Sequence, residues 1–157
     1  MQKKFYKFLT GSVLVIAIVG FQFVRGEVHD NELLVSFLDV GQGDSSLIQI
    51  PDGKNILIDG GPDDGVIFEL SKKLSWFDRT IDLMILTHPH ADHVNGLTKV
   101  IERYNVKKIL YTGVSHSSPT YIHWLKLIKD KNIPITIISK SQTIKLAENC
   151  FLEILYI

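Results

Sequence analysis

The feature that most constrains the fold is a buried-strand pattern that runs directly into a loop rich in histidine. Within residues 81–88, IDLMILTH, the stretch LMIL is apolar at four consecutive positions. A strand of this kind must be covered on both faces, which is typical of the sheet in an α/β protein. The loop THPHADH (87–93) therefore follows a buried strand, and the sequence after it has the periodicity of a helix.

The segments on either side predict a mixed sheet with helices. Three apolar runs are separated by the turn sequences GQGD and PDGK, which predicts three antiparallel strands. After residue 61, helical and strand patterns alternate, which is typical of an α/β fold. In the helix expected at 118–132, Ile122, Leu125 and Ile128 should face inward. The expected strands are 33–40, 45–50, 55–61, 81–88 and 106–112, with three short ones after residue 132; the other helices start at residue 62 and span 93–104.

Residues 1–25 predict a membrane anchor or a signal peptide. Three lysines precede an uncharged run from Leu9 to Val24, and the acidic residues come after it. Sixteen helical residues span about 24 Å, and counting from Phe5 extends the reach toward a bilayer core of about 30 Å. The charge order places the N-terminus in the cytoplasm. The prediction is a single-pass protein of the cytoplasmic membrane with its domain on the extracytoplasmic side; cleavage and secretion are the alternative.

Residues 26–32 form a polar linker, and residues 33–157 form the predicted domain. Seventeen basic and seventeen acidic residues cancel, so the formal net charge is zero. The chain thus lacks the broad basic surface that would favour nucleic acid as a partner.

The histidine loop predicts a metal site. His88 and His90 are two residues apart, so in an extended segment their side chains point the same way, and Asp92 and His93 follow where the helix begins. Imidazole and carboxylate are ligands for zinc, iron and manganese. A metal held by about three protein donors can lower the pKa of a bound water toward 7. The alternative is a surface loop whose histidines bind nothing.

THPHADH also matches the T-H-x-H-x-D-H signature, so the chain resembles the metallo-β-lactamase superfamily. FLDVGQGDSSLIQIPDGKNILIDGG (37–61) and DLMILTHPHADHVNGL (82–97) resemble one subgroup, which contains the C-terminal domain of the ComEC-type competence DNA-uptake channel. The resemblance implies an αβ/βα sandwich and a metal-dependent hydrolase. It also implies a phosphodiester substrate such as DNA, or another ester.

The resemblance assigns roles to residues of the motif. His88 and His90 would ligate a first metal, and Asp92 and His93 would face a second, with Asp92 also handling a proton. Zinc is the expected metal, one or two ions, with iron or manganese as alternatives. Asp59 would accept a hydrogen bond that braces the loop. Four further residues could line the pocket: Asp39, Gln42, Asp44 and His116. A structural role in the turn is the favoured interpretation of the first three, and a solvated loop is that of His116.

The chain departs from the superfamily in its extent. The superfamily fold has two similar halves, and the second half contributes the remaining metal ligands. Ile157 falls near the middle of that plan, so the sequence predicts an incomplete domain that corresponds to the N-terminal half. One apolar sheet face would then be open to a protein partner or to the missing half. The competing prediction is a non-catalytic, membrane-anchored module that binds metal or a partner.

Overall fold

The computed structural model describes residues 32–155. The predicted membrane segment at residues 1–25 lies outside this range, as does nearly all of the predicted linker. No helix in the described part of the chain is both long and apolar enough to cross a membrane.

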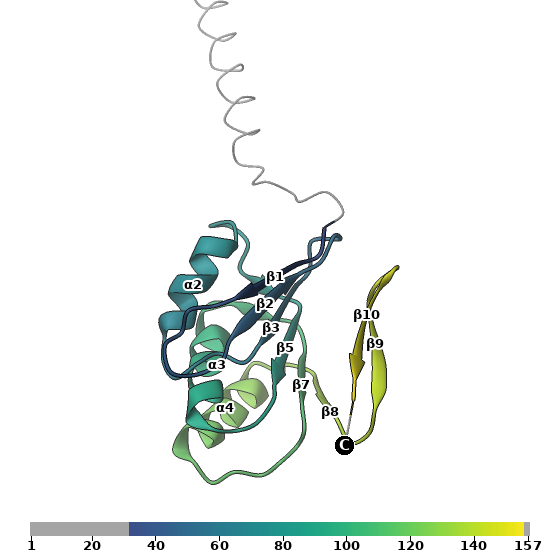
Figure 1. Ribbon diagram of the computed structural model, residues 1–157. Helices are drawn as coiled ribbons and strands as arrows, with labels where there is room; N and C mark the ends of the chain where they lie inside the picture. The colour runs from purple at the N-terminus through teal and green to yellow at the C-terminus, as the bar shows by residue number, and fades with distance from the viewer. Residues whose placement is uncertain (1–31, 156–157) are drawn as a thin grey trace, which may run out of the picture. The chain divides into compact units, whose positions relative to one another are not determined.

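A six-stranded mixed sheet forms the centre of the domain (Figure 1). The first three strands pair antiparallel, and the next three continue parallel to β3. The direction of each strand is set by the segment that connects it to the previous one, because tight turns join antiparallel strands whereas parallel strands need a crossover. The predicted α/β class and mixed sheet are confirmed. The strands in spatial order are β1 (Leu34–Phe37), β2 (Ser46–Gln49), β3 (Asn55–Ile58), β5 (Leu83–Leu86), β7 (Ile109–Tyr111) and β8 (Ile135–Ile137). The short strands β4 (Thr80–Ile81) and β6 (Asn105–Val106) pair with each other.

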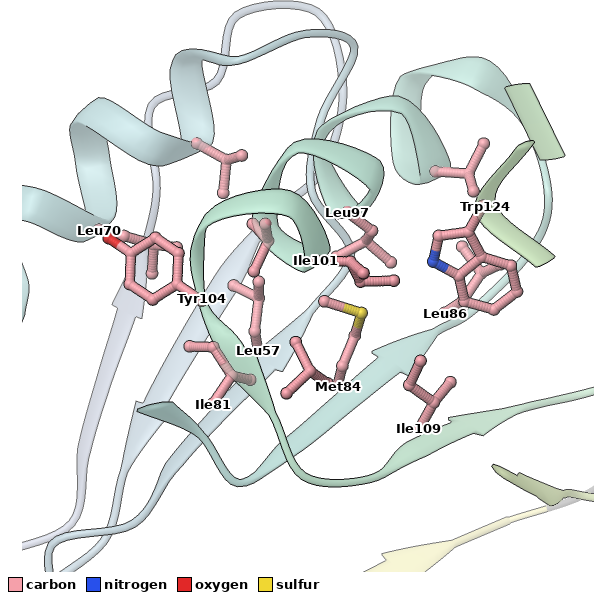
Figure 2. Close-up of a cluster of buried hydrophobic side chains, with 14 of the residues drawn as sticks. Leu57, Leu70, Ile81, Met84, Leu86, Leu97, Ile101, Tyr104, Ile109 and Trp124 are labelled. Atoms are coloured by element: carbon pink, nitrogen blue, oxygen red, sulfur yellow. The ribbon is translucent and has the colours of Figure 1, made fainter. Parts of the chain in front are cut away.

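Three helices cover one face of this sheet: α2 (Gly65–Lys73), α3 (Ala91–Arg103) and α4 (Pro119–Asp130). Figure 2 shows the interface, where Leu97 and Ile101 of α3 pack over Met84 and Leu57 of the sheet. All four side chains are almost completely buried. Burying a side chain of this size stabilises a fold by about 1.5–3 kcal/mol, so this layer is the main source of cohesion.

The inward face of α4 differs from the prediction at one position. Ile122 is 56% exposed, whereas Tyr121, Trp124 and Ile128 are buried. The buried face of α4 therefore begins at Tyr121, one residue before the predicted Ile122. The rings of Tyr121 and Trp124 stack with their centroids 5.8 Å apart. Large aromatic rings bury more apolar area than isoleucine does, which decides which side of the helix turns inward.

The other face of the sheet is partly covered by the chain itself. The hairpin of β9 (Gln142–Ala147) and β10 (Cys150–Ile154) packs Ile144 and Leu152 against the sheet residues Leu83 and Ile85. Lys54 Nζ also donates a 2.7 Å hydrogen bond to the carbonyl oxygen of Leu146. The open apolar face is thus smaller than the sequence indicated. At the β1 end it persists, since Phe37 is 85% exposed.

Two glycines allow the loop after β3 to cross α3 in direct backbone contact. A Cβ atom on Gly96 would lie 1.8 Å from the carbonyl oxygen of Gly60, and one on Gly60 would lie 2.3 Å from the Leu97 nitrogen. Gly96 N also donates to the carbonyl oxygen of Gly61 at 3.0 Å. This crossing sets the position of the first turn of α3 relative to the end of β3.

Candidate metal centre

The histidine loop lies at the carboxyl ends of two neighbouring parallel strands. Ile58 of β3 pairs in register with Ile85 of β5, so the residues that follow the two strands meet at the same sheet edge. Asp59 follows β3, and Thr87 and His88 follow β5. The carboxyl edge of a parallel sheet is where functional groups of α/β proteins gather.

Three histidine rings lie close together at this edge. The ring centroids of His88 and His93 are 3.8 Å apart, and those of His88 and His90 are 4.7 Å apart. His90 is the N-cap residue of α3, and Asp92 and His93 belong to its first turn. The strand end and the helix start thus converge on one small volume.

Asp59 connects the elements around this volume. The residue is 3% exposed, and its backbone has a φ of 55°, a left-handed conformation that aspartate tolerates better than most residues. Its carboxylate accepts hydrogen bonds from Thr87 N (2.9 Å), Thr87 Oγ1 (2.6 Å) and His93 Nδ1 (2.9 Å). A buried carboxylate needs such donors to offset the loss of water. Ser45 Oγ donates to the backbone carbonyl oxygen of Asp59 at 2.9 Å.

These bonds determine where two imidazoles carry hydrogen. The Thr87 hydroxyl has one hydrogen, which it donates to Asp59, so its oxygen accepts the 3.0 Å bond from His88 Nδ1. His93 Nδ1 donates to Asp59 directly. A neutral ring protonated at Nδ1 keeps its lone pair on Nε2. Asp59 therefore leaves the Nε2 atoms of His88 and His93 able to act as ligands. The sequence analysis assigned no role to Thr87; its place directly before His88 in the motif was the available signal.

Two further carboxylates face the His93 edge. Asp92 Oδ2 is 3.6 Å from His93 Nε2, and Asp44 Oδ2 is 4.0 Å from the same atom. Asp44 reaches this position because its loop packs on the first turn of α3, where a Cβ atom on Gly43 would lie 2.4 Å from the Asp92 carbonyl oxygen. The negative charge favours a cation beside the imidazole.

The remaining pocket candidates differ in position. Asp39 and Gln42 are exposed, and within residues 32–155 no hydrogen bond or ion pair joins either to the histidines. His116 is also exposed, as expected for a solvated loop, yet its ring centroid is 5.9 Å from that of His90. Its Nδ1 accepts a hydrogen bond from Ser118 N at 3.2 Å.

Tyr121 supports the loop that carries His116, and its titration predicts alkaline destabilisation. Its hydroxyl donates to the Val114 carbonyl oxygen at 3.0 Å. Burial, followed by the Tyr111 hydroxyl, raises the pKa of Tyr121 from 10.0 to about 12. The fold favours the neutral phenol, so its contribution is complete below pH 10 and is lost as the pH rises through about 12. Denaturation midpoints from pH 9 to 12 should fall more steeply for the natural protein than for Tyr121→Phe; parallel curves would contradict this assignment.

The donors suit a transition metal without already forming a complete site. Among the described residues, no three histidine, cysteine, aspartate or glutamate side chains are grouped so that they could hold a metal ion. Two ligands on one tetrahedral zinc are roughly 3.3 Å apart. The 3.6 Å between His93 Nε2 and Asp92 Oδ2 is only slightly wider. The chemistry of the donor set therefore fits zinc, and His93 Nε2 and Asp92 Oδ2 are spaced nearly as two ligands of one ion would be.

Comparisons with known proteins give a family match and a similar solved structure. The model of the metallo-beta-lactamase superfamily matches residues 38–150. Among solved structures, the Rm3 metallo-beta-lactamase is similar, with a TM-score of 0.47 and 17% sequence identity. That similarity covers 76% of this chain and 46% of the Rm3 chain, so the protein spans about half the length of that enzyme. No curated protein matches the chain significantly. Because the family match extends over well more than half of its residues, the chain belongs to the metallo-beta-lactamase superfamily.

Proposed function

We propose that the protein is a metal-dependent hydrolase that cleaves phosphodiester or other ester bonds with a metal-activated water. Superfamily membership supports the reaction class. The observation that carries the proposal is the hydrogen-bond set of Asp59, which in the neutral rings leaves the lone pair on Nε2 of His88 and of His93, with Asp92 Oδ2 3.6 Å from His93 Nε2. A carboxylate that accepts the remaining ring N–H of a ligating imidazole orients the ring and raises its basicity.

Each residue has a stated part in this proposal. His88 and His90 would hold a first metal, and Asp92 and His93 would hold a second. Zinc is proposed, one or two ions, with iron or manganese as alternatives. The metal supplies Lewis acidity and a bound water of lowered pKa. Asp92 is about half exposed, so its carboxylate can exchange a proton between the site and solvent.

The substrate and location are proposed from the sequence. The motifs at 37–61 and 82–97 resemble the ComEC-type competence subgroup, which favours DNA or another phosphodiester and a link to DNA uptake. Neither comparison distinguishes that subgroup from the rest of the superfamily. The apolar run before residue 25 favours an anchor in the cytoplasmic membrane, with the domain outside; a secreted protein is the alternative. A protein partner or a further half-domain would cover the remaining open sheet face.

A non-catalytic role is the second candidate. The sheet face left open at β1, where Phe37 is 85% exposed, favours an interaction module, with or without a bound metal, that does not turn over substrate. The two candidates differ in one measurement, because only the enzyme hydrolyses a chromogenic phosphodiester after loading with metal.

Removing His90 tests the proposed function. In the full chain, His90→Ala should weaken zinc binding by at least about 100-fold, since even outer partners of a ligand contribute 10–100-fold. Phosphodiester hydrolysis should fall to background. His123→Ala is the matched control, because His123 is exposed on α4 beside Glu102 at 3.7 Å. Elemental analysis and turnover are measured for both variants. Unchanged zinc content and unchanged turnover in His90→Ala would disprove the proposal.

A further inference from the structure

Three large aromatic side chains are exposed on α2 and on the loop that directly follows it. Phe68 lies on α2, and Trp76 and Phe77 lie on the loop that follows it; Trp76 is 80% exposed. The rings of Trp76 and Phe77 meet edge to face, with centroids 5.8 Å apart. We call these three side chains the aromatic patch. The touching rings of Trp76 and Phe77 form a cluster of exposed apolar side chains, and such a cluster marks a contact surface, unlike a single exposed side chain.

The charges around the aromatic patch are sorted by sign. Lys72, Lys73 and Arg79 are exposed, and Lys72 Nζ lies 4.1 Å from the centroid of the Phe68 ring. The acidic neighbours are occupied: Glu69 is buried and binds Lys72, with 2.6 Å between Oε1 and Nζ. The two carboxylate oxygens of Asp78 accept bonds from Asn55 Nδ2 and Thr80 N. The Glu69–Lys72 pair is neutral, so Lys73 and Arg79 supply the basic charge of the outward surface, against the one carboxylate of Asp78.

The aromatic patch lies at the end of the sheet where the chain enters the domain. Leu34, the first residue of β1, pairs with Gln49, and Gln49 pairs with Asn55. Leu34 and Asn55 are therefore two strand spacings apart, which is about 10 Å. Asn55 Nδ2 donates in turn to Asp78 in the loop of the patch, at 2.9 Å. In Figure 1 the upper end of α2 and the start of β1 are at the same end of the sheet. The candidate metal centre is at the opposite end of the strands.

We infer that the aromatic patch and its basic residues dock on the surface of a bilayer with anionic headgroups. Tryptophan and phenylalanine beside lysine and arginine are the composition that binds such an interface. The inference rests on the proposed anchor and is independent of catalysis. Nine residues, 25–33, separate the apolar run from β1, and they reach at most about 32 Å. A domain of this size is about 36 Å across, so a linker of this reach keeps the β1 end of the domain within contact distance of the membrane. Docking by the patch turns the metal centre toward water.

Tryptophan fluorescence of the full chain in lipid nanodiscs tests this inference. The protein has two tryptophans, and Trp124 is completely buried. The difference between the natural protein and Trp76→Phe therefore reports Trp76 alone. In nanodiscs with anionic, brominated lipids, this component should be quenched at least about twofold relative to unbrominated lipids, because a docked side chain enters the headgroup boundary. Lys73→Glu should reduce the quenching, whereas Lys126→Glu, the same exchange at an exposed residue of α4, should not.

Three other results would each contradict the inference. A chain that enters nanodiscs but shows an unquenched Trp76 excludes docking while leaving the anchor intact. A chain that does not associate with lipid excludes both. Shielding of Trp76 that depends on protein concentration would assign the patch to self-association instead. None of these results bears on metal binding or hydrolysis, so failure here is distinct from failure of the proposed function.

Discussion

Replacing Gly96 by alanine is expected to destabilise the domain by about 3 kcal/mol or more. The new Cβ atom would lie 1.8 Å from the Gly60 carbonyl oxygen and 2.5 Å from its carbonyl carbon. Both are backbone atoms of a buried crossing, so no side chain can rotate away, and α3 must shift instead. Overpacking in a well-packed core costs about 1–3 kcal/mol, and backbone contacts lie at the upper end or beyond. Against a total stability of about 5–15 kcal/mol, this loss is large.

Urea denaturation of the full chain, followed by circular dichroism, measures this effect. Gly65→Ala is the matched control: Gly65 also lies in a helix, and the only atom near its Cβ position is Asp63 Oδ1 at 3.0 Å, on an exposed side chain. The control should be neutral or stabilising by up to about 1 kcal/mol. Equal midpoints for the two variants would show that the crossing of Gly60 and Gly96 does not constrain α3.

Exchanging Asp59 for asparagine is expected to reduce zinc affinity by about 10–100-fold while the fold is kept. Asparagine has nearly the same shape and also tolerates the left-handed φ of 55°. One carboxylate oxygen, Oδ2, accepts from both Thr87 Oγ1 and His93 Nδ1. The backbone N–H of Thr87, which donates to Oδ1, cannot turn away, so the amide NH₂ takes the Oδ2 position, where at least one imidazole would have to change its tautomer or rotate. Its Nε2 would then lose its role as a prepared ligand.

Equilibrium dialysis with zinc alone provides a readout that does not depend on activity. Asp63→Asn is the matched control, because Asp63 accepts only a local, exposed bond from Gly65 N at 2.8 Å. It should bind zinc as the natural protein does. Nitrogen NMR of the histidine rings should show altered protonation at His93 in Asp59→Asn only. Unaltered zinc affinity in that variant would remove the observation on which the proposed function depends.

The sequence was informative wherever the relevant residues are neighbours along the chain. The antiparallel strand order up to β3 follows from the short turns at GQGD and PDGK, and the buried strand β5 follows from its unbroken apolar run. His88, His90 and His93 occupy one short segment, so their proximity could be expected from local geometry. Ile122 was misplaced because the apolar periodicity of α4 allows more than one inward face, and the packing of Trp124 selects between them.

The sequence by itself determined the α/β class, the strand that precedes the histidines and the types of donor in the loop. Only the tertiary structure decided which atoms of those donors are ready to bind. The Asp59 bonds to Thr87 and His93 join residues 28 and 34 positions apart, and they depend on the register between β3 and β5. The same holds for His116 beside His90, for the hairpin on the second sheet face and for the aromatic patch. Periodicity and turn chemistry act over a few residues, whereas these contacts form only when distant segments pack together.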